Sequence, residues 1–543
     1  MTLEDIKGRD HLKSPETEKS QKYALISVSD KTGVVELART IQGLGYVIIS
    51  SGGTARNLGE NGIPVTPVED ITGNPECFDG RMKTISFEVE SGIIYDRRKP
   101  SHVEDASRLQ VPQIDLVVCN LYPFEKTVQK PDVTLDEAVE NIDVGGPTMV
   151  RAAAKNFQSV LVVVDPADYQ RVGEALKTNT VTGELRQQLA IKAFRHLSFY
   201  DAQIGNFLEK DLYQDEEAPF PREIALPGRK AFDLRYGENP DQQGAVYLEP
   251  NTKSPLKNLQ RHAGRELGLV NITDINAGLE SVRLFETPAA VVIKHNSPCG
   301  IALGANYADA LQRAIDGDPD SAFGGIVVLN GKFNLAAAQV IERFNKEGRG
   351  NMDIVVAPFI DEDALKLLKA VRKSTGIYTF GEIPKFDPNA RNLKWIDGGY
   401  VLQTPNNDVE SGFKDWEVVT EAQPTPKQLR QMQIAWKFIT RIRSNSVIVV
   451  DKNVPMTIGI GSGQTSRIKS ARIALDQAGE YAQGAILASD SFFPFDDTVR
   501  MAAAYKIGAI VQQGESINDK ASIDLANRVG IPMVLTHHRA FWH

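Results

Sequence analysis

Residues 291–300 read Val-Val-Ile-Lys-His-Asn-Ser-Pro-Cys-Gly. The β-branched residues of this stretch predict a buried strand, and the Ser-Pro-Cys-Gly segment predicts a turn directly after it. In open α/β sheets, ligands bind at the carboxyl ends of the strands. We therefore expect Lys294 and His295 to reach a ligand, the lysine as a cation and the histidine as a proton acceptor near neutral pH. A surface loop after a core strand explains the same pattern, so the rest of the chain has to decide.

Length and composition indicate a soluble globular protein of several domains. The chain has 543 residues, of which 42% are hydrophobic and 24% charged, so two to four domains are expected. The net charge of −9 argues against bulk attraction to nucleic acid. No apolar run approaches the roughly 20 residues that span a bilayer. Residues 1–22 are polar and charge-mixed, and we expect them to form a flexible tail.

Cysteine and histidine usage predicts neither disulfides nor a metal site. The three cysteines, Cys77, Cys119 and Cys299, are far apart in the sequence, which favours a reducing compartment. The sequence contains no H-E-x-x-H motif and no CxxC pair, so no zinc site is predicted. We expect a cytoplasmic protein that needs no metal.

Strand and helix patterns alternate through the first half of the chain. Strands are predicted at residues 23–29, 46–50 and 115–120, and the alternation predicts a parallel sheet with helices on both faces. The loop Ser51-Gly52-Gly53-Thr54 follows one of these strands and precedes a helix pattern. Glycines and free helix amides of this kind suit a phosphate, although an ordinary strand-to-helix turn has the same composition.

An acidic, proline-bearing stretch divides the chain. We place the first domain at residues 23–210, a linker at 211–229 and the second domain at 230–543. The second domain shows strand-helix alternation in two clusters, which fits the two subdomains, at about 230–400 and 401–543, that the family resemblance described below implies.

Six motifs of the first half occur in a characteristic order: SVSDKTG, SGGTA, GRMKT, CNLYPF, IDVGG and RAAAKN. Together they resemble the bifunctional purine-biosynthesis enzyme family that joins 5-aminoimidazole-4-carboxamide ribonucleotide (AICAR) formyltransferase to IMP cyclohydrolase. The resemblance continues through the second half and covers nearly everything after residue 22. It implies an α/β fold, with a methylglyoxal-synthase-like, Rossmann-type cyclohydrolase domain followed by a transformylase domain of two cytidine-deaminase-like α/β subdomains.

For the cyclohydrolase, the resemblance implies catalytic roles for Lys155, Tyr122 and Asp143 in closing a ring with loss of water. Positioning and a cation at the developing oxyanion would supply much of such a step. The residues implied in nucleotide binding are Ser29, Asp30, Lys31, Ser51, Gly52, Gly53, Thr54, Arg81, Met82, Lys83, Thr84, Cys119, Asn120, Asp143 and Val144.

For the transformylase, the resemblance implies 10-formyltetrahydrofolate as co-substrate and a homodimer with the site between subunits. His295 would act as the base, with Lys294 and Asn445 stabilising the oxyanion. The residues implied in AICAR binding are Arg235, Tyr236, His295, Gly324, Asp353, Asn445, Arg467, Arg539 and Phe541. Those implied in folate binding are Ile468, Phe492, Asp497, Ser516 and Ile517.

The sequence departs from the family pattern at a few positions. Residues 85–87 read Ile-Ser-Phe where members usually carry Leu-His-Pro, and a further family histidine is absent from Glu90-Ser91-Gly92. Asp241 replaces a family histidine, and Gln513 and Glu515 replace the usual Pro and Gly. These departures leave two alternatives open: a chain that retains one of the two activities, or a nucleotide-binding regulatory protein without turnover.

Two further patterns have simpler explanations. Gly459, Gly461 and Gly463 resemble a dinucleotide fingerprint, but the third glycine comes one residue early, which disfavours a nicotinamide oxidoreductase. The Phe-Phe-Pro-Phe run at 492–495 is explained by core packing alone, although a flat aromatic wall also suits a pterin ring.

Overall fold

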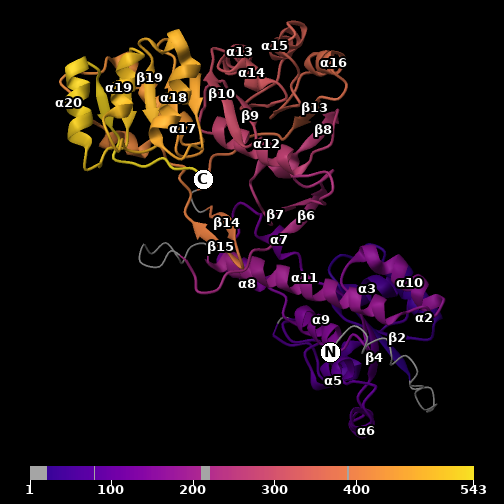
Figure 1. Cartoon of the computed structure of the whole chain (residues 1–543). Helices are drawn as coiled ribbons and strands as arrows, with labels where there is room; N and C mark the ends of the chain where they lie inside the picture. Colours follow the sequence, from indigo (N-terminus) through magenta and orange to yellow (C-terminus); the bar gives the residue numbers. More distant parts are fainter. Residues whose placement is uncertain (1–20, 79, 210–219, 388–389) are drawn as a thin grey trace. The chain divides into compact units, whose positions relative to one another are not determined.

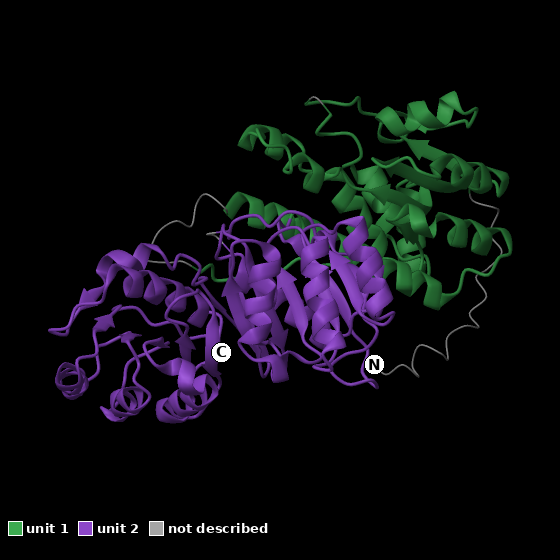
Figure 2. Ribbon diagram, turned by 90° about the horizontal axis from the view of Figure 1, so that it is seen from above, with its two compact units in different colours: residues 1–229, 249–251 green, residues 230–248, 252–543 purple. Residues whose placement is uncertain are grey.

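The computed structural model describes residues 21–78, 80–209, 220–387 and 390–543 (Figure 1). The chain divides into two compact units, one up to Arg229 with Glu249–Asn251, the other Lys230–Leu248 with Thr252–His543 (Figure 2). The expected tail, up to residue 20, and the expected linker, from 211 to 219, lie outside the described residues. Within the described ranges, every helix is too short or too polar to span a membrane.

Unit 1 is built on a five-stranded sheet in which every pair of neighbours is parallel. The strand order is β3-β2-β1-β4-β5, and the central strands are buried on both faces, which explains their continuous apolar runs. The parallel sheet predicted from the sequence is confirmed. The strands are β1 (Lys22–Val28), β2 (Val47–Ser50), β3 (Thr66–Pro67), β4 (Gln113–Asn120) and β5 (Leu161–Val163).

Helices pack against this sheet in two groups. Helix α9 contacts α5 and α11, all three contact the sheet, and α2 packs with α10. The helices are α2 (Val34–Gly43), α3 (Gly52–Glu60), α4 (Val68–Thr72), α5 (Phe87–Ile94), α6 (Pro100–Arg108), α7 (Phe124–Thr127), α8 (Leu135–Glu140), α9 (Gly145–Lys155), α10 (Tyr169–Lys177) and α11 (Gly183–Glu209).

Unit 2 contains two six-stranded mixed sheets with the same topology. Their orders are β10-β9-β11-β12-β13-β8 and, written in the same direction, β18-β17-β19-β20-β21-β16. In each sheet, the first strand of the repeat in chain order, β8 or β16, lies at one edge and pairs antiparallel with the last strand, β13 or β21. The next two strands form an antiparallel pair at the other edge, and three parallel strands lie between. The predicted pair of α/β subdomains is confirmed.

The strands of these sheets are β8 (Gln260–Ala263), β9 (Ala289–Lys294), β10 (Ser297–Leu303), β11 (Ile326–Leu329), β12 (Ile354–Ala357), β13 (Gly376–Thr379), β16 (Glu417–Val418), β17 (Val447–Val450), β18 (Thr457–Gly461), β19 (Ile486–Ser489), β20 (Ala509–Gln512) and β21 (Met533–Leu535). The helices are α12 (Leu269–Val282), α13 (Tyr307–Asp316), α14 (Pro319–Ala322), α15 (Leu335–Lys346), α16 (Glu362–Val371), α17 (Pro426–Ile439), α18 (Arg467–Ala478), α19 (Asp497–Ala504) and α20 (Asp519–Val529). Two small hairpins complete the unit, β6 (Arg229–Asp233) with β7 (Ala245–Leu248) and β14 (Asn392–Ile396) with β15 (Gly399–Gln403).

The same close contact between a strand and a helix occurs in each of the two repeats. A Cβ on Gly300 of β10 would lie 2.0 Å from the carbonyl oxygen of Ala314 in α13, and one on Gly459 of β18 would lie 1.9 Å from that of Ala474 in α18. Both glycines occupy equivalent places in their strand ladders. Glycine is required at both because the helix backbone packs directly on the strand.

The edge strands β10 and β18 join the two sheets. Leu303 N donates to Pro455 O at 2.9 Å, and Ile301 N donates to Thr457 Oγ1 at 3.0 Å. An isolated bridge between these contacts is antiparallel. Because β10 and β18 run in opposite directions, the amino ends of β11 and β12 lie on the same side of unit 2 as the carboxyl ends of β19, β20 and β21.

The turn predicted at Ser297–Gly300 is wrong. Ser297 pairs with Lys294, so the hairpin turns at His295 and Asn296. These two residues have φ of 55° and 58°, the left-handed conformation of a two-residue type I′ turn. The Ser-Pro-Cys-Gly segment begins β10, where Pro298 is tolerated because the strand is at the edge of its sheet.

The glycine contacts generate a stability prediction. We expect Gly459→Ala to lower the free energy of unfolding of unit 2 by about 3 kcal/mol, because the new methyl group cannot fit against a backbone oxygen. All four tryptophans lie in unit 2, so urea denaturation followed by tryptophan fluorescence reports on it. Gly399→Ala, at a position with nothing within 4 Å of the added Cβ, is the control. Equal stabilities of the two variants would contradict the packing.

Candidate active sites

In unit 1, Asn120 at the end of β4 organises the loop that follows β1. Its Oδ1 accepts hydrogen bonds from Ser29 N at 2.7 Å and Asp30 N at 2.8 Å, and its Nδ2 donates to Asp30 O at 3.0 Å. Thr54 of α3 fixes the same strand end, exchanging hydrogen bonds of 3.1 and 3.0 Å with the backbone of Val28. Three segments far apart in the sequence therefore meet at the carboxyl edge of the sheet.

Two lysines flank the first turn of α3. A Cβ on Gly52 would lie 3.6 Å from Lys83 Nζ, and one on Gly53 would lie 3.9 Å from Lys31 Nζ. Lys83 also forms an ion pair with Glu76 at 2.9 Å. The first amides of a helix have no intrahelical acceptors, and with two ammonium groups beside them they have the composition that suits a phosphate.

Asp143 lies at the start of α9 on the same edge. Its Oδ1 accepts from Gly146 N at 2.9 Å, and its own N–H donates to Tyr200 Oη at 2.8 Å. Burial raises the pKa of Asp143, against the lowering effect of hydrogen bonds from backbone amides including that of Tyr122. Burial also raises the pKa of Cys119, so this residue remains a thiol. A carboxyl group with a raised pKa can take part in proton transfer nearer neutrality.

The other residues expected in this pocket come from the same loops. Thr84 Oγ1 lies 2.8 Å from where a Cβ on Gly145 would be. Arg81 is exposed and forms an ion pair with Glu140. Tyr122, Met82 and Val144 are exposed, and Ser51 precedes the first turn of α3.

Lys155 is separated from this pocket within its own chain. It is the last of the eleven residues of α9, whose first is Gly145, and a helix rises 1.5 Å per residue, so the two ends are about 15 Å apart. Lys155 lines a different groove of about 390 Å³, between α9, α5 and α11. The structure thus brings the loop residues together and leaves the expected catalytic lysine at the other end of α9.

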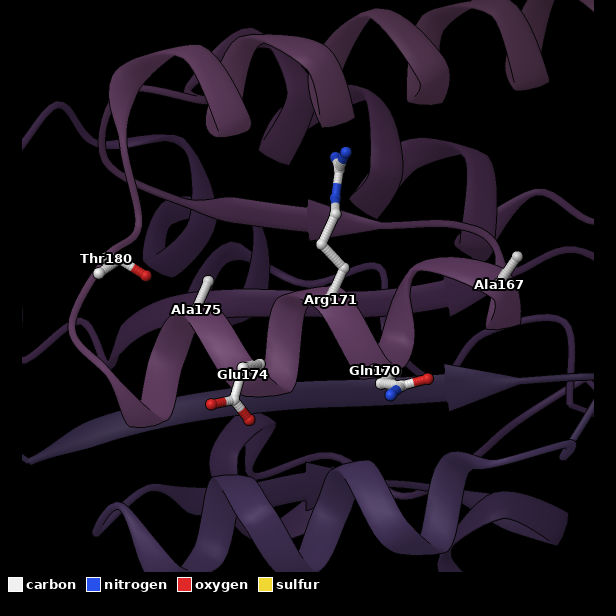
Figure 3. A pocket seen from close by; sticks show the side chains of 6 residues that line it. All are labelled: Ala167, Gln170, Arg171, Glu174, Ala175 and Thr180. Carbon is white, nitrogen blue, oxygen red and sulfur yellow. The ribbon is translucent and has the colours of Figure 1, made fainter.

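A second hollow of unit 1, of about 550 Å³, lies along α10 (Figure 3). None of the expected site residues lines it. Its lining residues are Ala167, Gln170, Arg171, Glu174, Ala175 and Thr180.

In unit 2, the β9–β10 turn presents His295 to solvent. Lys294 Nζ donates to Phe323 O at 2.9 Å, at the amino end of β11. The buried carboxylate of Asp274 fixes the turn by accepting from Asn296 N at 2.6 Å. Burial raises the pKa of Asp274, while the nearby charge of His295 lowers it. Sequence reasoning missed Asp274, because nothing in its helix pattern distinguishes it from an ordinary buried polar residue.

Further AICAR residues expected from the sequence border this turn. Gly324 precedes β11 and Asp353 precedes β12, so both lie at the same amino edge. Asp353 forms ion pairs with Arg265 at 2.7 Å and Arg372 at 3.3 Å. Its charge is therefore already balanced by side chains of the protein.

Arg235 and Tyr236 are held beside the start of α12. Arg235 N donates to Leu267 O at 2.8 Å, and a Cβ on Gly268 would lie 2.8 Å from the Tyr236 ring. The same helix carries Asp274 further along, so this segment and the histidine turn share a support. Asp241, the residue that departs from the family histidine, is exposed to solvent.

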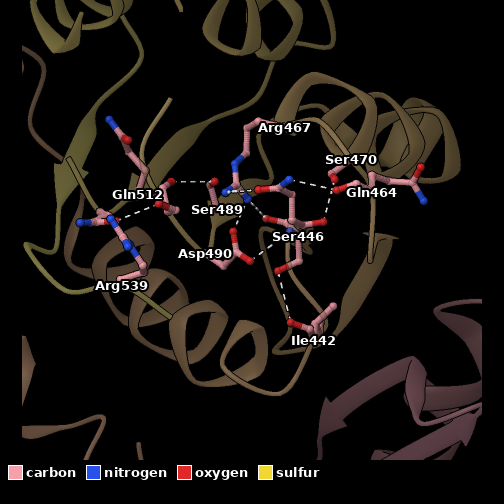
Figure 4. Close-up of polar contacts among 12 residues, drawn as sticks. Ile442, Ser446, Gln464, Arg467, Ser470, Ser489, Asp490, Gln512 and Arg539 are labelled. Atoms are coloured by element: carbon pink, nitrogen blue, oxygen red, sulfur yellow. Dashed lines mark hydrogen bonds and ion pairs between the residues drawn. The ribbon is translucent and has the colours of Figure 1, made fainter. Parts of the chain in front are cut away.

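A second cluster, centred on Arg467 and Asp490, lies beside the start of β17 (Figure 4). Arg467 donates to Asn445 Oδ1 at 2.9 Å and to Ser446 O at 2.9 Å, and it forms an ion pair with Asp490. Asn445 Nδ2 in turn donates to Gln464 O at 3.0 Å. Arg467 is only 7% exposed, and these internal acceptors hold it. In this structure Arg467 orients Asn445, a role that the sequence did not indicate.

Arg539 belongs to the same edge and is held by a residue that departs from the family pattern. Its Nε donates to Gln513 Oε1 at 3.3 Å, and Ser491 Oγ donates to the same oxygen at 2.8 Å. Gln513 Nε2 donates to Glu515 Oε2 at 3.2 Å. Glu515 has φ of 69°, the left-handed conformation that favours the glycine usual at this position. Arg539 also lies 4.9 Å from the ring centroid of Phe541.

The residues expected at the folate lie around this second cluster. Ile517 is fully exposed in the loop after β20, and Ser516 N donates to Asp519 Oδ2 at 2.9 Å. Phe493 is fully buried, whereas Phe492 is partly exposed, so the aromatic run contributes to the core and to the surface. Asp497 begins α19 and Ile468 follows Arg467 in α18.

The two clusters of unit 2 face the same side, because β10 and β18 run antiparallel. His295 follows β9 and Asn445 precedes β17, with β10 and β18 between them. Because β10 and β18 lie between them, the two residues are at least three strand spacings of about 4.8 Å, or about 15 Å, apart. Within the described ranges, no group of three or more His, Cys, Asp or Glu side chains gathers as a metal site would.

Comparison with known proteins decides the family. Residues 153–477 match the family model described as the AICARFT/IMPCHase bienzyme, and residues 33–148 match that of the MGS-like domain. The "Bifunctional purine biosynthesis protein PurH" of Oceanobacillus iheyensis is 44% identical over 523 residues, covering 96% of this chain and 100% of the relative. The chain belongs to the AICARFT/IMPCHase bienzyme family. The resemblance recognised in the sequence is confirmed, as is the methylglyoxal-synthase-like fold of the first domain.

Other members of the family match equally completely. The proteins of the same name from Acetivibrio thermocellus and Listeria welshimeri are 43% and 44% identical, over 526 and 531 residues, and each match covers 96% of this chain and 100% of the relative. A solved structure titled "Crystal structure of ForH" is 34% identical and covers 35% of this chain and 97% of its own, with a TM-score of 0.32. A TM-score this low adds nothing to the assignment.

The buried ion pair of the second cluster generates a prediction. We expect Asp490→Asn to lower the free energy of unfolding by about 3 kcal/mol, because it leaves the charge of Arg467 buried and unbalanced. Asp496→Asn, which breaks an exposed pair with Arg500, should cost less than about 1 kcal/mol. Urea denaturation of both variants checks this, and a cost for Asp490→Asn no larger than that of the control would contradict the buried pair.

Proposed function

We propose that the two activities of the family are divided between the two units, with cyclisation in unit 1 and formyl transfer in unit 2. The chain is a bifunctional AICAR formyltransferase and IMP cyclohydrolase of purine biosynthesis. The division rests mainly on the exposed Lys294–His295 turn, which belongs to unit 2, whereas the loops that suit a phosphate belong to unit 1.

In formyl transfer, the 5-amino group of AICAR attacks the formyl carbon of 10-formyltetrahydrofolate. This amine is a poor nucleophile because its lone pair is delocalised towards the carboxamide, so a base must remove its proton as the bond forms. His295 is exposed and held in a rigid turn, and it takes that proton. Lys294 and Asn445 stabilise the oxyanion of the tetrahedral intermediate, an effect usually worth several kcal/mol.

In cyclisation, the carboxamide nitrogen of the formylated product, FAICAR, attacks the formyl carbon, and water is lost to give IMP. The phosphate binds at the first turn of α3 between Lys31 and Lys83, which fixes the nucleotide in place. Holding the reacting groups together supplies much of an intramolecular step. Asp143 lies close to the same pocket and exchanges a proton with the reacting carboxamide. Lys155 stabilises the negative charge that develops on the formyl oxygen.

The working form is a homodimer in this proposal. Lys155 is about 15 Å from the loop pocket along α9, and Asn445 is about 15 Å from His295 across the sheet edges. Both separations exceed the reach of one side chain, so a second copy of the chain completes each site. The substrates are small nucleotides and a folate, and the three free cysteines fit a reducing cytoplasm.

His295 provides the test of formyl transfer. We expect His295→Ala to lower the formyl-transfer rate by at least about 100-fold, the usual contribution of a general base, and to leave FAICAR cyclisation unchanged. Two absorbance assays check this, one supplied with AICAR and 10-formyltetrahydrofolate and one with FAICAR alone.

Lys155 provides the reciprocal test. Lys155→Ala should lower the cyclisation rate by a similar factor and preserve formyl transfer, and Lys177→Ala, an exposed lysine of α10, should affect neither. Loss of both activities in either folded variant would contradict two separate sites. Absence of both activities from the unmodified chain would favour a regulatory nucleotide-binding protein.

A further inference from the structure

The groove that contains Lys155 is formed by three helices of unit 1. Helix α9 contributes Thr148, Arg151 and Lys155, which share one stripe because they are three, four and seven residues apart. Helix α5 contributes Glu90 and α11 contributes Asp201. At about 390 Å³, the groove is within the size range of small-molecule sites.

Glu90 has no partner in this groove. Its Oε1 is buried and makes no hydrogen bond within the part of the chain that the structure describes. Arg151 and Lys155 line the same groove and are exposed, and neither forms an ion pair with the described carboxylates. Among the described residues, Glu90 is therefore an unpaired carboxyl group that shares the groove with two exposed cations.

Burial raises the pKa of Glu90 to about 7. The ionisable groups that line the groove with it are Arg151 and Lys155 from α9 and Asp201 from α11. Glu90 is therefore protonated below neutral pH and ionised above it. A group that changes charge in this range can give and take protons under working conditions.

We propose that Glu90 exchanges protons with Lys155 during the ring closure that produces IMP. This inference rests on the proposed function, because it takes Lys155 as the lysine of the cyclohydrolase. Glu90 is then a proton-relay residue that gives protons to Lys155 and regains those that the nitrogen of the substrate releases. It belongs to the Glu90-Ser91-Gly92 segment, from which the family histidine is absent.

The chemistry of cyclisation requires such an exchange. The carboxamide nitrogen forms a bond to the formyl carbon and loses one proton, while the formyl oxygen gains one and becomes a hydroxyl. A second proton is then lost from nitrogen as the carbon–oxygen bond breaks, the C=N bond forms and the hydroxyl leaves as water. Two protons thus move from nitrogen to oxygen. Lys155 delivers protons to the oxygen, protonated Glu90 restores its charge, and the protons released by nitrogen return to Glu90.

The pH dependence of cyclisation tests the proposal. We expect the FAICAR cyclisation rate of the unmodified chain to fall as pH rises through about 7, because Glu90 then loses the proton it supplies. Glu90→Gln should lower the rate at pH 6 by on the order of 100-fold and remove this fall. Glu90→His should restore much of the rate and a fall near pH 6.5. Glu88→Gln, on the same helix and outside the groove, is the matched control and should behave like the unmodified chain.

Three outcomes separate the possibilities. A folded Glu90→Gln variant that keeps the rate and the pH profile overturns the role of Glu90 and leaves the proposed function intact. If Lys155→Ala also cyclises FAICAR at the normal rate, the proposed function of this lysine fails as well. Thermal unfolding at pH 8 controls for folding, and there Glu90→Gln should be at least as stable as the unmodified chain because it no longer buries a carboxylate. A variant that unfolds at pH 8 contradicts the burial from which the inference starts.

Discussion

The antiparallel contact between β10 and β18 is the constraint on which the second unit depends. In the first repeat, the polar residues lie at the amino ends of the central parallel strands. In the second repeat, they lie at the carboxyl ends of these strands. If the two edge strands ran parallel, these residues would lie on opposite sides of the unit. The hydrogen bonds from Ile301 to Thr457 of β18 and from Leu303 to Pro455, just before β18, set the direction, so both clusters face one side of the unit.

Much of the fold could be predicted from the sequence, because buried strands and helix starts leave local patterns. The strand before Ser51 and the helix after it are where the sequence indicated, since apolar runs and glycines act within a few residues. The β9–β10 turn could not be located in this way. The Ser-Pro-Cys-Gly segment has the composition of a turn, but the register of the hairpin, set by long-range pairing, assigns the turn to His295 and Asn296.

The candidate site was predictable where motifs mark it and unpredictable where tertiary contacts define it. Motifs predict Asn445 and Arg467 as site residues, yet the buried pair of Arg467 with Asp490 depends on segments distant in sequence. Likewise, RAAAKN marks Lys155 without revealing that a whole helix separates it from the loops it was expected to join. Sequence patterns report residue type and local conformation, whereas the distance between two motifs depends on the packed structure.

The equivalence of the two sheets also bears on how the second unit arose. The strand ladders place Asn330 of the first repeat at the position of Asp490 in the second. Asn330 accepts a hydrogen bond of 2.8 Å from Ala289 N at the start of β9, and Asp490 accepts one of 3.0 Å from Ser446 N just before β17. By the same register, His295 corresponds to Lys452. An ancestral duplication followed by divergence accounts for this pattern: the histidine turn occurs in one copy, and the asparagine held by a buried arginine occurs in the other.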